Sequence, residues 1–340
     1  MKVTLKDVAD AAGVSIATVD RVLNRREGVR GDTVARVEAA IRQLGYAPSS
    51  LASRVQPAPS RTLFLLPLGG NPFFTSLTDG VGQLREWLPF AGSTFDVRTV
   101  DVFDGPVLAA ALERAGGDGY DGIAVVALDH PAVKEAINAL TRAGVRVVTL
   151  VSDVPGSLRD RYVGIDNTAA GRTAGSLTAR FLPNRRGKVA FITGSFALRD
   201  HAERCFGFEQ VIAQDFPDVE VIAVREGRDD PERVAHLVRD LLHDHPDLAG
   251  LYNVGAGTGG VIRALEAAGR AREVVFVAHE LTQESRSALL RGTIDAVIGQ
   301  DPRHEARSAA RVLQALINGF PVLDDQERIR IEVYLRDNLP

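Results

Sequence analysis

The stretch VTLKDVADAAGVSIATVDRVLN, Val3 to Asn24, determines how the start of this chain folds. Apolar residues recur at helical spacing from Leu5 to Ala12, and Thr4 is a suitable N-cap for the helix that this pattern predicts. Gly13 supplies a residue that readily takes positive φ at a turn. Ser15 is a suitable N-cap for a second helix. The stretch therefore predicts two short helices joined by a glycine turn.

A third helix is predicted from about Asp32 to Leu44, where apolar residues again recur at helical spacing, and Gly45 ends it. Two helices joined by a short glycine turn form either an ordinary helical hairpin or a helix-turn-helix, whose second helix enters the DNA major groove. Spacing alone leaves both alternatives open. The residues expected to face the core of this small domain are Leu5, Val8, Ala12, Val19, Val22, Leu23, Val34, Val37, Ile41 and Leu44.

The sequence of the first stretch resembles the lac repressor (LacI) family, because the motif T-L-x-D-V-A-x-x-A-G-V-S-x-x-T-V-x-R-V-L-N is reproduced from Thr4 to Asn24. The resemblance implies a DNA-binding domain over residues 1–48. Ile16 and Ala17 would meet apolar features such as a thymine methyl group, and Arg21 would meet a guanine edge. Phosphate contacts, which position the protein without specifying sequence, are expected from Thr4, Ser15, Thr18, Asn24 and the Arg25–Arg26 pair.

Residues 49–60 are predicted to hold a hinge helix and a linker. In the family this helix folds when two copies meet on the operator, and it inserts an apolar side chain into the minor groove. Ala52 and Val55 would make these contacts, with Val55 at a position where leucine is commoner. Because valine is shorter and a poorer helix former, we expect weaker bending of the DNA. A plain linker remains the alternative.

From Arg61 onward, apolar strand-like runs alternate with helical patterns, which predicts parallel sheets covered on both faces. The resemblance implies a two-lobed body like the periplasmic sugar-binding proteins over residues 61–340, with the chain crossing between lobes near 162–164, 291–293 and 319–323. The predicted strands are Thr62–Leu68, Phe95–Val102, Gly122–Leu128, Arg146–Val151, Lys188–Thr193, Val219–Arg225, Gly250–Val254, Val274–Ala278 and Ala296–Gly299.

The fold class predicted for the whole chain is α/β. An N-terminal three-helix helix-turn-helix DNA-binding domain and a hinge helix precede a two-lobed, doubly wound, parallel-sheet ligand-binding domain.

Candidate ligand contacts follow the ends of these strands, where doubly wound folds bind their ligands. Asn71 beside Phe73 and Phe74 suits a sugar, since aromatic rings stack on its C–H face and an amide bonds its hydroxyls. In the family, Arg204 aligns with a pocket arginine and Gln300 with a pocket glutamine of the sugar binders. The full predicted set is Asn71, Phe73, Phe74, Asp129, His130, Asp153, Arg199, His201, Arg204, Asn253, His279 and Gln300.

Several of these residues have a second interpretation. Asp129 either accepts from ligand hydroxyls or caps the helix that starts at Pro131, and Arg199 is either a ligand contact or a surface residue. His279 is either a ligand contact or a core histidine. At least one of the two phenylalanines is expected in the core. Val254 stands where relatives usually have aspartate, so the pocket lacks a carboxylate that many sugar binders use.

A rival interpretation rests on Gly255–Gly260, which contains G-x-G-x-x-G between a predicted strand and the predicted helix Val261–Ala268. This pattern is typical of dinucleotide sites and would suit a nucleotide-dependent enzyme on a doubly wound fold. Because the motif is short and lies late in the fold, we favour the interpretation that its glycines let the backbone approach the cleft. The histidines are scattered and no serine elbow occurs, so no metal, cofactor or enzymatic activity is expected.

The charges and the single cysteine bear on partners and compartment. Residues 1–60 hold nine Lys/Arg and six Asp/Glu, a charge of +3, whereas the remainder carries −7, which suits a head that meets phosphates. Cys205 alone forms no internal disulfide and fits a reducing cytoplasm. No apolar run approaches the ~18 residues of a membrane helix, and no export signal opens the chain, which disfavours a transport-type binding protein.

Taken together, these features predict a ligand-responsive transcriptional regulator. We expect a cytoplasmic, nucleoid-associated repressor that binds a near-palindromic operator DNA as a homodimer. A sugar or related small polyol in the cleft between the lobes would act as its effector. No membrane partner is expected.

Overall fold

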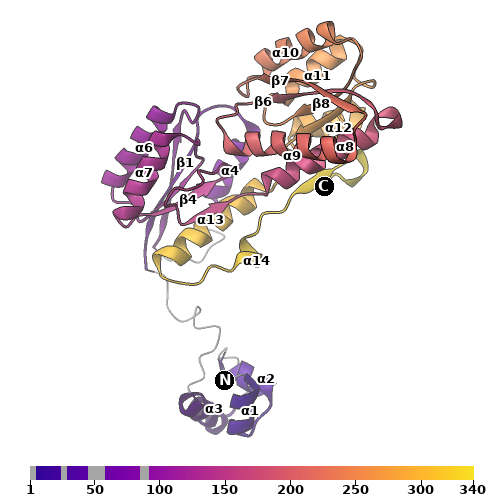
Figure 1. Cartoon of the computed structure of the whole chain (residues 1–340). Coiled ribbons are helices and arrows are strands. Elements are labelled where there is room, and N and C mark those ends of the chain that lie inside the picture. Colours follow the sequence, from indigo (N-terminus) through magenta and orange to yellow (C-terminus); the bar gives the residue numbers. More distant parts are fainter. Residues whose placement is uncertain (1–4, 24–28, 45–57, 85–91) are drawn as a thin grey trace. The chain divides into compact units, whose positions relative to one another are not determined.

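The computed structural model describes residues 5–23, 29–44, 58–84 and 92–340 (Figure 1). Contacts divide the chain into two compact units, the head, Met1–Pro57, and the body, Ala58–Pro340. The hinge helix and four of the predicted DNA contacts, Thr4, Asn24, Ala52 and Val55, lie outside the described residues. Within those residues, no helix is long and apolar enough to cross a membrane.

The head contains three helices, α1 Leu5–Ala12, α2 Ile16–Leu23 and α3 Gly31–Leu44. Gly13 takes φ +64 at the turn, and the backbone N–H of Thr18 donates to Ser15 Oγ at 3.2 Å, so the predicted turn and cap are confirmed. Arg36 of α3 donates to the carbonyl oxygens of Ala12 and Gly13, which ties the third helix to that turn. The buried core consists of Val8, Ala9, Ala12, Val19, Val22, Val37 and Ala40.

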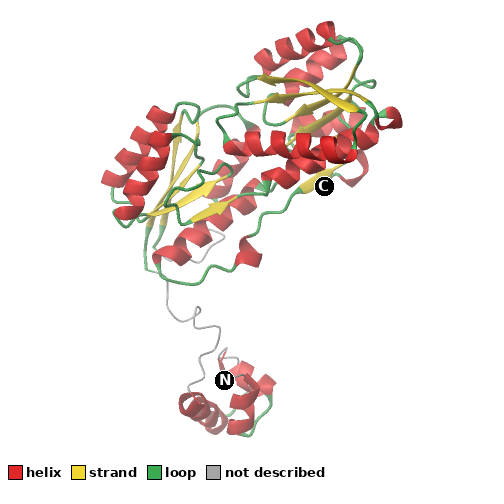
Figure 2. Cartoon of the chain, viewed as in Figure 1, coloured by secondary structure: helices red, strands yellow, loops and turns green. Residues whose placement is uncertain are grey.

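The first lobe of the body is a parallel sheet in the order β2-β1-β3-β4-β5 (Figure 2). Apolar side chains on its two faces pack against two different helix pairs, one of α6 and α7 and one of α4 and α13. Its strands are β1 Arg61–Pro67, β2 Thr94–Val100, β3 Gly122–Val125, β4 Arg146–Leu150 and β5 Arg161–Val163, and its helices are α4 Pro72–Gly82, α6 Gly105–Gly117, α7 Pro131–Arg142 and α13 Pro302–Ile317.

The second lobe is a sheet in the order β11-β10-β9-β8-β6-β7, parallel except for β11. Helices α8 and α9 cover one face, and α10, α11 and α12 cover the other. Its strands are β6 Gly187–Thr193, β7 Val219–Glu226, β8 Leu248–Asn253, β9 Val275–His279, β10 Ala296–Gly299 and β11 Glu332–Tyr334, and its helices are α8 Asn167–Phe181, α9 Arg199–Asp215, α10 Pro231–Asp244, α11 Thr258–Ala267 and α12 Gln283–Arg291.

The chain crosses between the lobes between β5 and α8, between β10 and α13, and between α14 (Asp324–Glu327) and β11. The first crossing follows the predicted 162–164. The prediction near 291–293 is wrong, because the next strand, β10, pairs with β9 in the same sheet. The third crossing lies beyond the predicted 319–323, since α14 still bonds to the first lobe through Arg311 and Glu327.

Glycines allow α8 and α9 to pack in close contact. A Cβ atom on Gly171 of α8 would lie 2.0 Å from the carbonyl oxygen of Arg204, and one on Gly207 of α9 would lie 2.1 Å from that of Thr168. The neighbouring atoms are backbone, which cannot move aside without shifting a helix. This contact sets the position of Arg204 in the body.

We predict that Gly207→Ala lowers the free energy of unfolding by about 1–3 kcal/mol, the usual range for overpacking a tight contact. Urea unfolding of the full chain measures the change. Gly117→Ala in α6 is the control, because its Cβ would meet nothing within 4 Å, and it should be neutral or slightly stabilising. Equal stability of Gly207→Ala and the parent protein would contradict the close contact.

Candidate functional site

A cavity of about 510 Å³ lies between the two lobes of the body. Small-molecule sites typically have a volume of ~300–1,000 Å³. Its walls come from segments that follow the carboxyl ends of strands in both sheets, which is where doubly wound folds bind ligands. The lining segments include Pro67–Phe74 after β1, Val151–Ser152 after β4, Arg228–Asp229 after β7, Gly255–Gly259 after β8, His279–Glu280 after β9 and Gln300 after β10, together with Asp200, His201 and Arg204 of α9.

The first-lobe wall is built around the start of α4. The Asn71 side-chain oxygen accepts from the backbone N–H of Phe73 at 3.0 Å and caps the helix. The Phe73 and Phe74 rings meet edge to face, with centroids 5.2 Å apart. Phe73 is buried in the core, as expected for at least one of the two, and both rings line the cavity. This wall therefore offers apolar ring surface beside the amide nitrogen of Asn71.

Arg204 of α9 is the buried cation of the second-lobe wall, with 3% of its surface exposed. Its Nε donates to Asn167 Oδ1 at 2.9 Å and its Nη1 donates to the carbonyl oxygen of Val254 at 3.0 Å. Its Nη2 has no hydrogen-bond partner among the described residues. Two elements thus fix the guanidinium, and one N–H edge remains for a ligand.

His279 and Gln300 join the wall from neighbouring strands. Nε2 of His279 lies 2.6 Å from the Tyr252 hydroxyl, and burial lowers the pKa of His279 well below its ordinary value, so the ring is neutral. His279 is therefore both a core histidine and a cavity residue, which combines the two alternatives. Gln300 Nε2 donates to Glu280 Oε1 at 3.0 Å. Within the described part of the chain, His279 Nδ1 and Gln300 Oε1 are buried without partners.

Four cavity carboxylates were missed by the sequence-based set, namely Asp200, Asp229, Glu280 and Glu284. Burial raises the pKa of Glu280 to about 7, against the opposing charge of Arg204. Val254 does stand in place of an aspartate, but these four groups supply carboxylates from other positions in the chain. Glu280 directly follows a predicted contact at a strand end, so sequence position gave a usable signal for it alone.

Four cavity residues have backbone strain. Val151, Arg228, Asp229 and Glu280 take φ of 65, 53, 58 and 66, although none is glycine. Among the described non-glycine residues, the only others with positive φ are Asn184 and Arg185. Such conformations persist where the surrounding structure holds them, and they concentrate at functional sites. Their clustering here supports the cavity as the functional site of the body.

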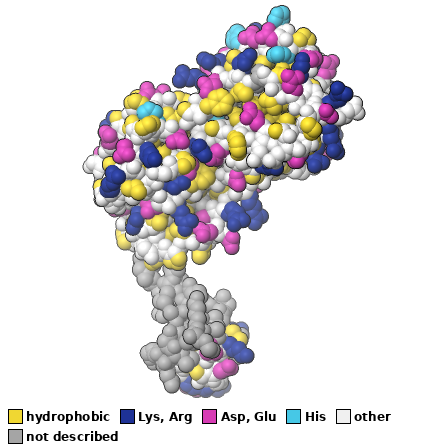
Figure 3. Space-filling view, in the orientation of Figure 1, with side chains coloured by type: hydrophobic (Ala, Val, Ile, Leu, Met, Phe, Trp, Pro, Cys, Tyr) yellow, Lys and Arg dark blue, Asp and Glu magenta, His cyan; other side chains and the backbone are white. Residues whose placement is uncertain are grey.

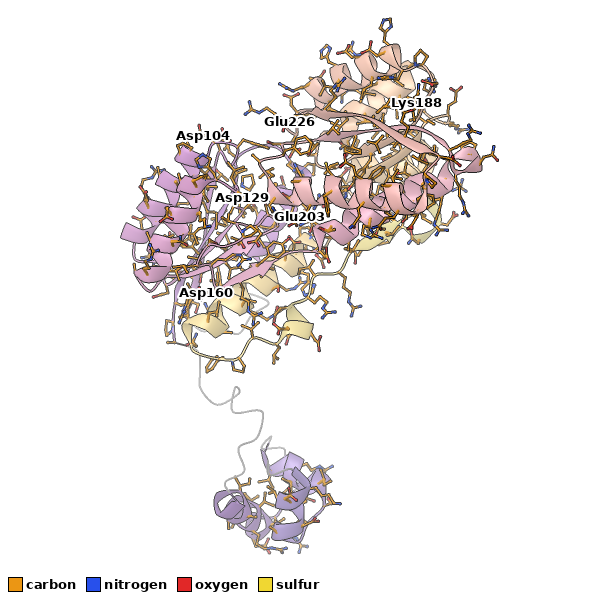
Figure 4. The ribbon with its side chains drawn as sticks, in the orientation of Figure 1. Asp104, Asp129, Asp160, Lys188, Glu203 and Glu226 are labelled. Atoms are coloured by element: carbon orange, nitrogen blue, oxygen red, sulfur yellow. The ribbon has the colours of Figure 1, made fainter. Side chains whose placement is uncertain are left out.

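Five predicted contacts do not line the cavity. His130 caps α7, because its Nδ1 accepts from the N–H of Ala132 at 3.2 Å, so the alternative of Asp129 as the cap is wrong. Arg199 instead pairs with Glu203 at 2.7 Å, both on α9, and Figure 4 labels Glu203 on that helix. The five predicted contacts outside the cavity lining are Asp129, His130, Asp153, Arg199 and Asn253.

Two of these five residues support the loops around the cavity. Asp153 accepts from Arg159 and Thr149, and although burial alone would raise its pKa, these hydrogen bonds lower it. The Asn253 amide donates to the carbonyl oxygens of Gly255 and Ala256 at 2.9 and 3.1 Å. Their role in the structure is therefore to hold the loops that do line the cavity.

Packing explains the glycines of the G-x-G-x-x-G pattern. A Cβ on Gly255 would lie 2.8 Å from both Asp229 and His201, and one on Gly260 would lie 2.1 Å from the Pro231 carbonyl oxygen. Gly257 takes φ +84 at the start of α11. The structure thus accounts for this loop by close approach of backbone and side chains, without a dinucleotide.

On the head, α2 presents the residues predicted to meet bases. Ile16 is 51% exposed, although it is apolar, and Arg21 is exposed as well. Ser15 is exposed and Thr18 partly so, and their hydroxyls lie 2.9 Å apart. The side chain of Ala17 lies outside the described residues. Contact of these residues with DNA stays a prediction.

Comparison with known families covers both units. The profile of the periplasmic binding protein domain matches residues 63–320. The chain belongs to this family. The profile of bacterial regulatory proteins of the lacI family matches residues 4–49, so the head is a lacI-family DNA-binding domain.

Relatives with curated names match parts of the chain. The ribose operon repressor of Escherichia coli K12 is 44% identical over 79 residues, which are 23% of this chain and 24% of the repressor. The transcriptional repressor PurR of Vibrio cholerae is 29% identical over 217 residues, 62% of this chain and 60% of PurR. The matches therefore span about a quarter of the first relative and three fifths of the second.

Solved structures resemble the fold of the body. The glucose-galactose binding protein GanP of Geobacillus stearothermophilus superposes with a TM-score of 0.75 at 24% identity, over 83% of this chain and 99% of GanP. A solute binding protein of Burkholderia graminis, solved with D-arabinose, also gives 0.75 at 24% identity, over 84% of this chain and 98% of that protein. At this level of identity the likeness establishes the fold alone.

The raised pKa of Glu280 predicts a pH-dependent stability. A carboxyl whose folded pKa is about 7, against an ordinary 4.5, favours the folded state when protonated. Its contribution is therefore lost as pH rises from about 4.5 through 7, by on the order of 2–3 kcal/mol. We expect the difference in unfolding free energy between the parent protein and Glu280→Gln to fall by this amount between pH 5 and pH 8, as measured by urea unfolding.

Glu113→Gln provides the control for this measurement, since Glu113 is exposed on α6. Its difference from the parent protein should stay flat over the same pH range. A flat difference for Glu280→Gln would show that the carboxyl ionises as freely in the folded protein as in the unfolded chain.

Proposed function

We propose that this protein is a transcriptional repressor controlled by a small hydroxylated effector. The observation that carries the proposal is the joining, in one chain, of a lacI-family DNA-binding head to a binding-protein body with a cavity between its lobes that is lined by both apolar and polar side chains. The two relatives named above are repressors. Operator DNA and an effector are therefore its two partners.

The effector we propose is a sugar or a related polyol. Phe73 and Phe74 offer ring surface, while Arg204 Nη2 and Gln300 Oε1 offer a free donor and a free acceptor. This mixture of apolar faces and convergent polar atoms suits the C–H faces and hydroxyls of a sugar. Structures with the same fold have been solved with D-arabinose and with D-allose.

Regulation would follow from differential binding. The cavity is walled by both lobes, so a ligand that contacts both changes the relative stability of their arrangements. Action as a homodimer would present two α2 helices to the half-sites of a near-palindromic operator. An enzyme on this fold remains the weaker alternative, since the glycine loop has a packing explanation and the named relatives are regulators.

A gel-shift assay with the DNA upstream of the gene tests the proposal. The full chain should retain one specific duplex, with two chains bound per duplex, and one member of a sugar and polyol panel should change the affinity. If no specific duplex is retained at any ligand or salt concentration, the repressor proposal fails. Chemical conversion of a panel member without DNA binding would support the enzyme.

A substitution at Arg21 tests the predicted base contact on the duplex that the gel shift identifies. Arg21→Ala should reduce operator affinity by roughly 1–3 kcal/mol and relax specificity at one base pair, as expected for loss of a bidentate guanine contact. Fluorescence anisotropy on single-base-pair variants of the operator measures both effects. Arg114→Ala, an exposed arginine of α6 in the body, serves as control. An equal loss on every sequence would instead assign Arg21 to the phosphate backbone.

A further inference from the structure

The charges that line the cavity are unbalanced. Four carboxylates, Asp200, Asp229, Glu280 and Glu284, face two guanidinium groups, Arg204 and Arg228. By contrast, positive and negative side chains are interspersed over the face of the molecule in Figure 3. An anionic ligand would meet an excess of like charge in this cavity. The lining favours a ligand that is neutral or positively charged.

The excess is concentrated in one cluster, which we call the acidic subsite, made of Asp200, His201 and Asp229. Nε2 of His201 lies 3.7 Å from Asp200 Oδ2. A Cβ on Gly255 would lie 2.8 Å from both Asp229 Oδ1 and His201 Nε2, so the ring and the Asp229 carboxylate flank the same glycine. Two acidic side chains thus converge on one corner of the cavity.

The hydrogen bonding of Asp200 indicates independently that the acidic subsite lacks a donor. Only 5% of its surface is exposed, and within the described residues its Oδ1 accepts no hydrogen bond. Asp229 Oδ1 accepts from the N–H of Ala256 at 3.1 Å, and the structure shows no donor to its other oxygen among those residues. A buried carboxylate oxygen without a donor is costly, which points to a ligand that supplies one.

Two of the unpaired atoms around the cavity are oxygen acceptors. In the part of the chain that is described, the buried unpartnered atoms of lining residues are Asp200 Oδ1, Gln300 Oε1, His279 Nδ1 and Arg204 Nη2. The Asp200 and Gln300 oxygens accept only, Arg204 Nη2 donates, and the role of His279 Nδ1 is set by the tautomer of its ring. The ligand must therefore bring a donor to each of the two oxygens.

A metal ion is not a suitable occupant. Among the described residues, no group of three or more His, Cys, Asp or Glu side chains is placed to hold one. A protonated amine fits both requirements, since it carries three N–H donors and one positive charge. A hydroxyl brings one donor and no charge, so hydroxyls alone would leave the excess of acidic over basic side chains in the cavity uncompensated.

We propose that the effector carries a protonated amino group beside its hydroxyls, as in an amino sugar or an amino polyol, and that Asp200 and Asp229 hold that ammonium group. This inference rests on the proposed function, because it specifies the ligand of the same cavity. Phe73, Phe74 and Arg204 then contact the carbon skeleton and the hydroxyls. The acidic subsite selects against N-acetylated and acidic analogues, which lack the positive charge.

The test uses the full chain and matched probes in calorimetry and thermal-shift assays. The probes are D-glucosamine, D-galactosamine, D-mannosamine and 1-amino-1-deoxy-D-sorbitol, each with its N-acetyl form and its neutral parent, and D-glucuronate and D-galacturonate as anions. At least one amine should bind about tenfold or more tightly than both its N-acetyl form and its neutral parent, as one charge-assisted hydrogen bond implies. The anions should bind most weakly.

Two isosteric variants test whether Asp200 and Asp229 cause the preference for the amine. Asp200→Asn and Asp229→Asn should each reduce the preference for the amine over its N-acetyl form by about tenfold. Glu209→Gln, an exposed acid on the same helix as Asp200, is the matched control and should retain the preference. The comparison of probes on the parent protein does not depend on whether either variant folds.

The outcomes separate this inference from the proposed function. The inference is overturned if no amine binds, if the neutral parents bind as tightly as the amines, or if folded Asp200→Asn and Asp229→Asn keep the full preference. Binding of neutral sugars alone would leave the repressor proposal intact. Failure to retain a specific duplex at any ligand or salt concentration would overturn the repressor proposal and is measured separately, by gel shift.

Discussion

The contact between α8 and α9 is the constraint on which the cavity depends. Gly171 and Gly207 let the helix backbones approach until each would clash with a single added carbon atom. Asn167, at the start of α8, reaches Arg204 of α9 only because of this approach, and its oxygen holds Nε at 2.9 Å. A buried guanidinium needs such fixed partners, since an unpaired buried charge is strongly destabilising. Helix packing thus determines the electrostatics of the cavity.

The cavity combines groups whose protonation is set by burial. His279 stays neutral because burial lowers its pKa, while burial raises the pKa of Glu280 to about 7. Burial also raises the pKa of Asp229, which His201 opposes. Ionised carboxylates in such a site are stabilised by a cationic partner more than by a neutral one. The occupant and the protonation of these acids are therefore linked.

Much of this architecture follows from local patterns. All nine predicted strands correspond to observed strands, because each is a short run rich in apolar residues, whereas β5 and β11 span three residues each and show no such pattern. Asn71, Arg204 and Gln300 were placed from the family resemblance, and they lie at the cavity. Asp200 and Asp229 were missed, since the face of α9 and the left-handed loop after β7 decide their direction, and neither is visible in sequence spacing.

Gln300 lies both in the cavity and at the start of a crossing between the lobes, so it connects ligand binding to the relative position of the lobes. Gln300 bonds Glu280 in the second lobe, and the next residue, Asp301, caps α13, which packs in the first lobe. One crossing therefore begins at a cavity residue. In the first turn of α13, Glu305 is buried, and burial raises its pKa well above the ordinary value. A ligand bonded to Gln300 acts directly on this segment, which gives differential binding a physical route between the lobes.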